Sequence, residues 1–521
     1  MEKKGANIFS KVKSCAVHGV DGRMIDVEAD VNDGLPVFTM VGYLSSSVRE
    51  SSERVRTALK NSGFHLPPKR ITINLSPADM RKDGSGYDLA IATAVLLSLG
   101  VTAELPMEQT LVLGELSLDG SIKAIPGVLP MVICAREEGM TSCIVPKENV
   151  QEAALVQGIS VIGVSSLKET MEYIQGIKEY ENTNVEQPAV DTSEYLYDID
   201  FSDVVGQESI KRGMEIAAAG FHNVLLTGAA GAGKSMLAKR LPTILPQMSF
   251  EESLEVTKIY SVGGMLPPEG GLIHRRPFRA PHHTISEYAL IGGGRVPTPG
   301  EVSFAHYGVL FLDELPEFSK PVLEVLRQPL EDRRIRISRV QASYEFPADF
   351  MFVAAMNPCP CGNYPDYRRC SCTEQQIRRY QSKVSGPLLD RIDIRMEVKG
   401  VKQEVLFSKQ KTESSKTIRA RVEQARQMQK ERFAGTGLLF NSQLDGKNLE
   451  EYITLSEEGK RLVLQLFEEQ ELSVRGVHRV LKLARTIADL AGSEEIEHAH
   501  LQEAAFYRNQ DVFAKEVLYG N

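Results

Sequence analysis

Two hydrophobic patterns alternate along the first third of the chain. Short apolar runs bounded by turn-forming residues predict β-strands, and longer segments with apolar residues at helical spacing predict α-helices. The predicted strands are Arg70–Leu75, Leu111–Leu118 and Ser160–Val164, and the predicted helices are Ser46–Ser62 and Asp88–Leu99. We therefore expect a first domain of mixed α and β structure.

A second pattern begins near residue 203. Wholly apolar runs at Val224–Thr227, Val309–Leu312 and Phe350–Met356 are followed by Gly, Asp-Glu or Asn, and helical segments separate them. Strands buried on both faces have this composition, so the pattern predicts a parallel α/β sheet. Beyond residue 398 a helical domain is expected, with helices at Ser415–Glu431, Ser456–Glu468, Val474–Leu490 and His498–Tyr507.

Composition adds a boundary and removes several classes of protein. Glu179–Ser202 is acidic and poor in aliphatic residues, as linkers are. The 521 residues are 42% hydrophobic and 25% charged, which indicates a globular chain. A formal charge of −9 confines any polyanion site to a local patch. The longest apolar run, Leu89–Val101, is too short to span a bilayer, and the N-terminus lacks a signal-peptide core, so we expect a cytoplasmic protein.

The most specific motif is GAAGAGKS (228–235). It lies between a predicted strand and a predicted helix, the setting that a phosphate-binding P-loop requires. Its backbone N–H groups turn toward the phosphates of ATP. Lys234 is expected to reach the β- and γ-phosphates, and the Ser235 hydroxyl to bind Mg²⁺. A chance Gly/Ala-rich turn would not need both flanking elements. The predicted nucleotide contacts are Gly228, Ala229, Ala230, Gly231, Ala232, Gly233, Lys234 and Ser235.

Two later strands end in residues that suit the same reaction. Val309–Leu312 leads into Asp313 and Glu314, a Walker-B pattern in which Asp313 supports Mg²⁺ and Glu314 activates the attacking water. The strand ending at Met356 is followed by Asn357, which is expected to orient that water if the strand lies between the other two. An isolated Asn at a strand end is otherwise a turn residue.

These motifs and four further runs carry a family resemblance. The runs are RRPFRAPHHT (275–284), PGEVSFAHYGVLFLDEL (299–315), AAMNPCPCG (354–362) and PLLDRID (387–393). Together they resemble the magnesium-chelatase-like AAA+ ATPases and, among these, the ComM family. The resemblance implies a hexameric ring in which Asn357 is sensor 1 and Arg391 is the arginine finger of a neighbour's site. Arg475 would be sensor 2, although Arg479 and Arg485 lie on the same predicted helix; surface salt bridges are the alternative for these arginines.

The first domain is similar to the proteolytic domain of Lon, through RKDGSG (81–86) and GELSLDGSIKAIPGVLP (114–130). Lon proteases use a Ser–Lys dyad, because a serine needs an adjacent base to become a nucleophile. In this register the nucleophile position falls on Gly86, one residue after Ser85, and the lysine position falls near Leu129. We expect a Lon-like fold without peptidase chemistry. The predicted units are residues 1–178 (Lon-like), 179–202 (linker), 203–398 (ATPase core) and 399–521 (helical lid).

Four of the seven cysteines lie within fourteen residues, as Cys359, Cys361, Cys370 and Cys372. Four thiolates can close a tetrahedral site, for which Zn²⁺ is the expected occupant. An iron–sulfur cluster would use the same number of ligands, and a metal-free cysteine-rich loop is the remaining alternative. The other three cysteines lie in apolar sequence and are expected to be buried.

Three basic segments could contact a nucleic acid. The first, residues 333–339, has four arginines and no acid and alternates with the following segment like a β-hairpin; the second contains Arg279, and the third, with Tyr367 and Tyr380, flanks the cysteines. Arginines interleaved with aromatic residues suit single-stranded DNA. Each alone could be a solvated charged face. The predicted DNA contacts are Arg334, Arg336, Arg339 and Arg279.

The leading hypothesis is a hexameric AAA+ motor on DNA, and the resemblance implies helicase and branch-migration activity that integrates single-stranded DNA during natural transformation. A chelatase-type motor that remodels a protein partner shares the ATPase core but needs neither the Lon-like domain nor the cysteines. An ATP-dependent protease is disfavoured by the missing dyad.

Overall fold

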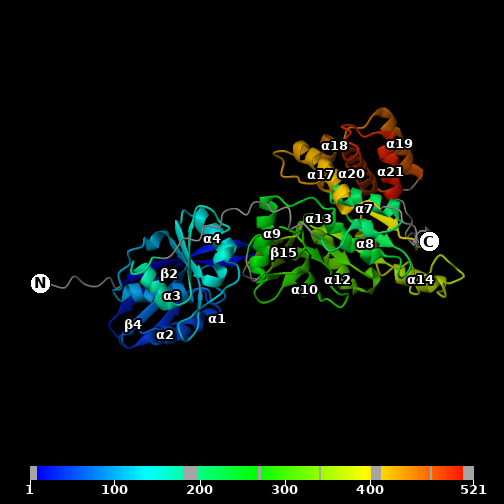
Figure 1. Cartoon of the computed structure of the whole chain (residues 1–521). Helices are drawn as coiled ribbons and strands as arrows, with labels where there is room; N and C mark the ends of the chain where they lie inside the picture. Colours follow the sequence, from blue (N-terminus) through cyan, green and yellow to red (C-terminus); the bar gives the residue numbers. More distant parts are fainter. Residues whose placement is uncertain are drawn as a thin grey trace.

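The computed structural model describes residues 9–179, 197–267, 271–339, 342–400, 412–469 and 472–508. An N-terminal α/β domain, a central α/β core and a helical C-terminal domain follow one another along the chain (Figure 1). Most of the predicted linker, residues 180–196, lies outside the described residues. Phe201, near its end, is buried in the same hydrophobic cluster as the strand that leads into the P-loop.

A seven-stranded mixed sheet, in the order β3-β4-β2-β1-β5-β8-β9, forms the N-terminal domain. Its strands are β1 (Phe9–His18), β2 (Asp21–Asn32), β3 (Val37–Val41), β4 (Arg70–Ser76), β5 (Thr110–Val112), β8 (Ser142–Pro146) and β9 (Ser160–Val164). A separate small hairpin pairs β6 (Glu115–Leu116) with β7 (Ile122–Lys123). The helices are α1 (Ser46–Arg49), α2 (Ser51–Asn61), α3 (Asp88–Ser98), α4 (Val128–Glu137), α5 (Val150–Ala153) and α6 (Leu167–Ile174).

The sequence pattern predicted this domain's mixed character but not all of its strands. The long β1–β2 hairpin was not predicted, because charged residues alternate with its buried ones and the pair gains its stability from a ten-residue register. The predicted strand Leu111–Leu118 is two strands, β5 and β6, separated by Gly114. The amide of Gly114 donates to the Gly86 carbonyl at 3.0 Å instead of continuing a ladder.

The core contains the predicted parallel sheet, with five strands in the order β11-β14-β17-β10-β18. These strands are β11 (Phe278–Arg279), β14 (Val309–Leu312), β17 (Met351–Met356), β10 (Val224–Thr227) and β18 (Ile394–Glu397). Buried residues fill β10, β14 and β17 completely, as a sheet covered on both faces requires. Because β17 pairs with both β10 and β14, the strand order brings their carboxyl ends together.

Helices and short ribbons complete the core and the C-terminal domain. Core helices are α7 (Glu208–Gly220), α8 (Lys234–Arg240), α9 (Phe250–Val262), α10 (Glu287–Ile291), α11 (Glu301–Phe304), α12 (Lys320–Val325), α13 (Arg327–Asp332), α14 (Glu374–Gln381) and α15 (Gly386–Leu389). The ribbons are β12 (Gly292–Gly293) with β13 (Thr298–Pro299), and β15 (Arg334–Ser338) with β16 (Ser343–Pro347). The C-terminal helices are α17 (Ser415–Arg432), α18 (Gly446–Tyr452), α19 (Glu457–Glu469), α20 (Val474–Leu490) and α21 (His498–Arg508). The predicted hairpin and the predicted helical domain are thus both present.

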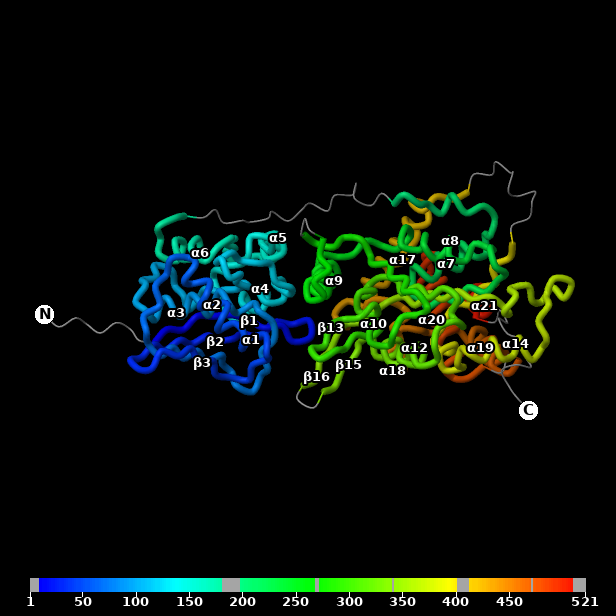
Figure 2. Tube along the Cα trace, turned by 90° about the horizontal axis from the view of Figure 1, so that it is seen from below, coloured from blue at the N-terminus to red at the C-terminus, as the bar shows by residue number. Residues whose placement is uncertain are grey.

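The N-terminal domain contacts the core through α4 and through the turn between β1 and β2, which lie toward the core in Figure 2. Helix α4 packs beside α9, where the amide of Gly127 donates to the Ser261 carbonyl at 3.0 Å. The β15–β16 hairpin reaches the turn after β1, where the His18 ring stacks on Tyr344 with ring centroids 4.4 Å apart. The hairpin therefore lies at the end of the core that faces the N-terminal domain. No helix among the described residues has the length and apolar character needed to cross a membrane.

Candidate nucleotide site and its surroundings

The P-loop joins the carboxyl end of β10 to α8. Gly228 must lack a side chain, because a Cβ there would lie 2.2 Å from the Val398 carbonyl oxygen. Gly231 and Gly233 have φ of +76° and +95°, which glycine adopts without strain, and a Cβ at either would meet no atom within 4 Å. The loop thus has a backbone conformation that glycine allows and open space beside it.

Lys234 lies at the centre of this loop. Its Nζ donates to the carbonyls of Gly228 at 2.7 Å and Ala229 at 2.8 Å, and to Asn357 Oδ1 at 3.0 Å. Burial lowers the pKa of Lys234, while the charges of Asp313 and Glu314 act in the opposite direction. The side chain is therefore held at the point where the P-loop, the Walker-B segment and Asn357 meet.

The predicted magnesium-binding groups are also in contact. Ser235 Oγ donates to Asp313 Oδ2 at 2.6 Å, so a hydroxyl and a carboxylate oxygen lie side by side at the carboxyl ends of the strands. Oxygen donors of this kind are what Mg²⁺ prefers. Together with the open space at Gly231 and Gly233, they fit Mg²⁺ bound to ATP.

Glu314 and Asn357 line one cavity, of about 810 Å³, beside the P-loop. Glu314 is exposed, and its backbone N–H donates to Asp313 Oδ1 at 2.9 Å. Asn357 follows the strand between β10 and β14 and points its side-chain oxygen at Lys234. The structure thus brings together the P-loop, Asp313, Glu314 and Asn357.

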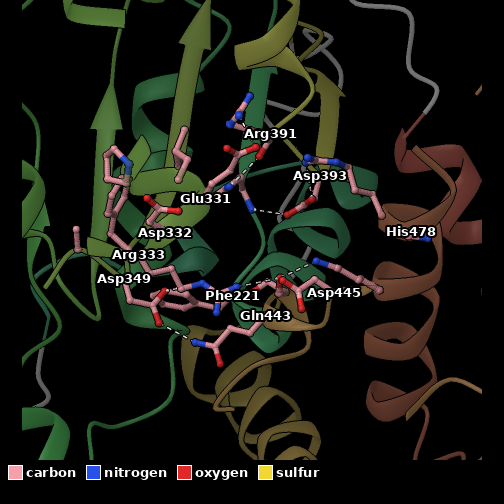
Figure 3. A pocket seen from close by; sticks show the side chains of 18 of the residues that line it. Phe221, Glu331, Asp332, Arg333, Asp349, Arg391, Asp393, Gln443, Asp445 and His478 are labelled. Atoms are coloured by element: carbon pink, nitrogen blue, oxygen red, sulfur yellow. Dashed lines mark hydrogen bonds and ion pairs between the residues drawn. The ribbon is translucent and has the colours of Figure 1, made fainter. Parts of the chain in front are cut away.

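Arg391 lies at the amino ends of the strands, opposite the P-loop, which follows a carboxyl end. It precedes β18, whose Ile394 pairs with Val224 at the start of β10, whereas the P-loop follows the end of β10. At about 3.3 Å per residue, a four-residue strand separates its amino end from its carboxyl end by roughly 13 Å. Arg391 is 8% exposed and forms an ion pair with Glu331 on α13 (Figure 3). Within one chain, then, Arg391 and the P-loop lie at opposite ends of the strands.

The three candidate arginines of α20 are not equivalent. Arg475 is exposed and lines the same pocket as Arg391, of about 560 Å³. Arg479 lines it too, and its guanidinium donates to Asp393 Oδ1 at 3.1 Å. Arg485 is buried and donates to Asp489 and to the carbonyls of residues 493 and 494. Only Arg475 and Arg479 face the pocket.

Asp393 anchors this arginine pocket and was not singled out from the sequence. It is buried; burial alone would raise its pKa, but hydrogen bonding to His222 and the charge of Arg479 hold that pKa well below its usual range. Lys482 lines the same pocket, and burial lowers its pKa to about 8. Asp393 lies in the PLLDRID run, so its position next to Arg391 was the available signal.

The four clustered cysteines are close in space as well as in sequence. Their Sγ atoms all lie within 4.8 Å of one another, and the four are not joined in disulfides. Cys359 is buried and the other three are half-buried. The cluster borders the cavity of Glu314 and Asn357, because Cys361 and Cys372 line it too.

The predicted DNA-contacting arginines do not form one surface. Arg334 and Arg336 share one exposed face of β15, yet both pair with Glu345 on β16, at 2.7 and 2.9 Å. Arg339 follows the strand and donates to the Gly294 carbonyl at 2.8 Å. Arg279, on β11, makes two 2.6 Å bonds to Glu301, which leaves it little capacity for a phosphate. The acid that balances the hairpin lies on the partner strand, where the run of arginines could not reveal it.

The Lon-like domain lacks a dyad at the predicted positions. A Cβ on Gly86 would lie 3.0 Å from Ile125 Cδ1, and Leu129, in the first turn of α4, is buried in the core of the domain. The neighbouring Ser85 hydroxyl donates to the Glu115 carboxylate. Lys82 is buried and donates to the Pro77 carbonyl, so it is engaged elsewhere.

A P-loop, Walker-B carboxylates and a strand-end asparagine on a parallel sheet, followed by a helical domain, define a P-loop ATPase of the AAA+ class. The chain belongs to the ComM family of magnesium-chelatase-like ATPases, as a relative aligned along most of the chain shows. The family model "Magnesium chelatase, subunit ChlI" matches residues 200–406. "Subunit ChlI of Mg-chelatase" matches residues 27–149, and "Magnesium chelatase, subunit ChlI C-terminal" matches residues 412–508.

Relatives align along most of the chain. The competence protein ComM of Haemophilus influenzae is 40% identical over 503 residues, 95% of this chain and 97% of the relative. The uncharacterized protein YifB of Escherichia coli is 41% identical over 507 residues, 96% and 97% of the two chains. Lon protease 2 of Bacillus subtilis is 30% identical over 183 residues, 31% of this chain and 32% of that protease. The resemblances to the chelatase-like ATPases, to ComM and to Lon are thereby confirmed.

Proposed function

We propose that the protein is a ring-forming, ATP-driven motor on DNA, with helicase and branch-migration activity that promotes integration of single-stranded DNA in natural transformation, in the cytoplasm. The observation that carries this proposal is the β15–β16 hairpin. It leaves the ATPase core between the Walker-B strand and the Asn357 strand, and the side chains of Arg334 and Arg336 are 50% and 59% exposed. Movement at the nucleotide site would thus reach a basic surface directly.

A ring is supported by the position of Arg391. A developing negative charge on the γ-phosphate calls for an arginine, and Arg391 is separated from its own P-loop by the sheet. A second copy of the chain that presents its Arg391 to the P-loop of the first would supply this positive charge. Arg475 and Arg479, which line the same pocket, would then act on the same neighbouring nucleotide.

The alignment with ComM supports the role in competence, and it extends through the N-terminal domain as well as the ATPase core. A protein-remodelling motor of the chelatase type is the second candidate, favoured by the three matching family models. Proteolysis is disfavoured by Gly86 and Leu129 at the dyad positions.

One experiment separates these functions. The ATPase rate of the full-length protein is measured alone, with single-stranded DNA and with forked DNA, and casein degradation is followed in parallel. The DNA motor predicts a several-fold higher rate with DNA and intact casein. An ATPase rate that neither DNA changes favours the remodelling motor. Degradation of casein would show that the protein is a protease.

For the four cysteines the proposed ion is Zn²⁺, because four thiolates at close quarters suit it best. An iron–sulfur cluster is disfavoured, since several irons and sulfides between the cysteines would hold their Sγ atoms farther apart than the 4.8 Å limit.

A further inference from the structure

The cysteine cluster and the nucleotide site are parts of one loop. Asn357, which accepts a hydrogen bond from Lys234, is only two residues before Cys359. After Cys361 comes Gly362, with φ of +80°, where a Cβ would lie 3.3 Å from the backbone nitrogen of Ala230 in the P-loop. The thiol-bearing loop therefore lies directly against the phosphate-binding loop.

The distances among the sulfurs match a single tetrahedral ion. Cys359–Cys361, Cys361–Cys370 and Cys359–Cys370 have Sγ–Sγ separations of 3.4, 3.6 and 3.8 Å. A zinc–sulfur bond of about 2.3 Å gives a tetrahedron with edges of about 3.8 Å. A disulfide would need about 2 Å. The backbone N–H of Tyr364 donates to Cys359 Sγ at 3.4 Å, the kind of outer hydrogen bond that orients thiolate ligands.

Little else holds this loop in place. Residues 363–376, all of them described, contain no buried residue, and Tyr367 at their centre is 75% exposed. One firm attachment is buried Gln381 on α14, whose side-chain amide donates to the Pro358 carbonyl at 2.9 Å. A segment without a hydrophobic core is ordered by its metal where it has one. Figures 1 and 2 show α14 and its loop at the end of the core away from the N-terminal domain.

We propose that one Zn²⁺ bound by Cys359, Cys361, Cys370 and Cys372 holds the 357–362 segment against the P-loop, so that the metal is a precondition for tight nucleotide binding. The ion takes no part in hydrolysis. It positions Asn357 beside Lys234 and Gly362 beside Ala230. This inference rests on the proposed nucleotide site, but it does not depend on DNA being the substrate.

The test compares the wild-type protein with Cys370→Ser and with the matched control Ser371→Ala, whose exposed residue lies between two ligands. Elemental mass spectrometry measures zinc and iron, and a fluorescent ATP analogue with Mg²⁺ measures nucleotide affinity without DNA. Wild type and Ser371→Ala should carry about one zinc per chain. Cys370→Ser should lose the metal and bind nucleotide about tenfold or more weakly, with unchanged circular dichroism. Normal affinity without metal, or a wild type with neither zinc nor iron, would overturn the proposal.

If Cys370→Ser does not fold, wild-type protein can be stripped reversibly with a mercurial thiol reagent. Dithiothreitol with Zn²⁺ should restore nucleotide affinity, and dithiothreitol alone should not. Recovery with dithiothreitol alone would show that the thiols, and not the ion, matter. Cobalt loaded in place of zinc should give the absorption bands of a tetrahedral four-thiolate site.

Gly362→Ala tests the contact without changing a ligand. It should keep the zinc but weaken nucleotide binding, because the new methyl group presses on Ala230. Gly437→Ala is the control, since Gly437 has a similar φ of +76° and a Cβ there meets no atom within 4 Å. Equal nucleotide affinity in the two variants would refute the coupling.

The two proposals can fail separately. If DNA leaves the ATPase rate unchanged while nucleotide binding still needs the metal, the DNA motor fails and the coupling stands. If DNA stimulates hydrolysis in the wild type while metal-free Cys370→Ser binds nucleotide with wild-type affinity, the coupling fails and the motor stands.

Discussion

Glu314 occupies a backbone conformation that few residues with side chains adopt. Its φ of 52° and ψ of 47° lie in the left-handed region, which costs a non-glycine residue about 1 kcal/mol or more. Its backbone N–H is held by Asp313, and its side chain borders the cavity of Asn357. Strain at this position, next to the magnesium-binding groups, supports a role for the carboxylate in the reaction.

Glu314→Gln is expected to leave nucleotide affinity near wild type and to lower the ATPase rate roughly a hundredfold or more, because the water loses its base while the P-loop is unchanged. Lys234→Ala should instead weaken binding itself, since the ammonium is lost from the loop centre. Equilibrium binding and steady-state phosphate release distinguish the two. Near-normal turnover in Glu314→Gln would show that another group activates the water.

Among the elements, the β15–β16 hairpin combines opposite charges. Arg334 and Arg336 project from the same face two residues apart, and Glu345 pairs with both from the facing strand. Hydrogen bonding from Arg336 opposes the effect of burial and keeps the pKa of Glu345 below its usual value. The acid thus moderates the attraction of this face for phosphates.

Replacing Arg334 and Arg336 together with Ala should weaken DNA binding at every sequence and flatten the plot of log affinity against log salt by about one to two units. Glu345→Gln should have the opposite effect, steepening the slope by up to about one unit, because both arginines become available. Fluorescence anisotropy over a salt series measures both. Unchanged slopes in both variants would remove the hairpin from the DNA interface, and intact nucleotide binding serves as the folding control.

At the scale of the whole molecule, the candidate nucleotide site and the arginine pocket lie at opposite ends of the strands of one sheet. Lys234 and Asn357 lie at the carboxyl ends of the strands, and Arg391 and Arg479 lie near Asp393 at the amino ends. In the proposed ring, a nucleotide site is complete only where two chains meet.

Mixing Arg391→Ala protein with Lys234→Ala protein should therefore recover part of the ATPase activity that each lacks alone, because some interfaces pair an intact P-loop with an intact arginine. The rate is measured across mixing ratios, with each variant mixed with itself as the control. Absence of recovery, once size-exclusion chromatography has verified mixed assemblies, would contradict a role across the interface.

The sequence alone was sufficient for features that depend on local order. The glycines of the P-loop, the apolar strands β10 and β14 and the C-terminal helices α17, α19, α20 and α21 follow from spacing, because neighbouring residues determine backbone conformation and burial; the short helix α18 was not predicted. The hairpin was predictable for the same reason. The β1–β2 pair was not, since its order comes from pairing along ten residues rather than from either strand's own pattern.

Tertiary structure decided what depends on residues far apart in the chain. The strand order alone places Asn357 beside Lys234, which is 123 residues earlier in the chain, and Arg391 at the other end of the strands. Only the folded structure shows that the cysteine-bearing loop lies against the P-loop at Gly362, and that Glu345 pairs with two arginines of the facing strand. A linear pattern records which groups exist. Their distances are set by how the sheet is ordered and packed, and charge, metal binding and catalysis depend on those distances.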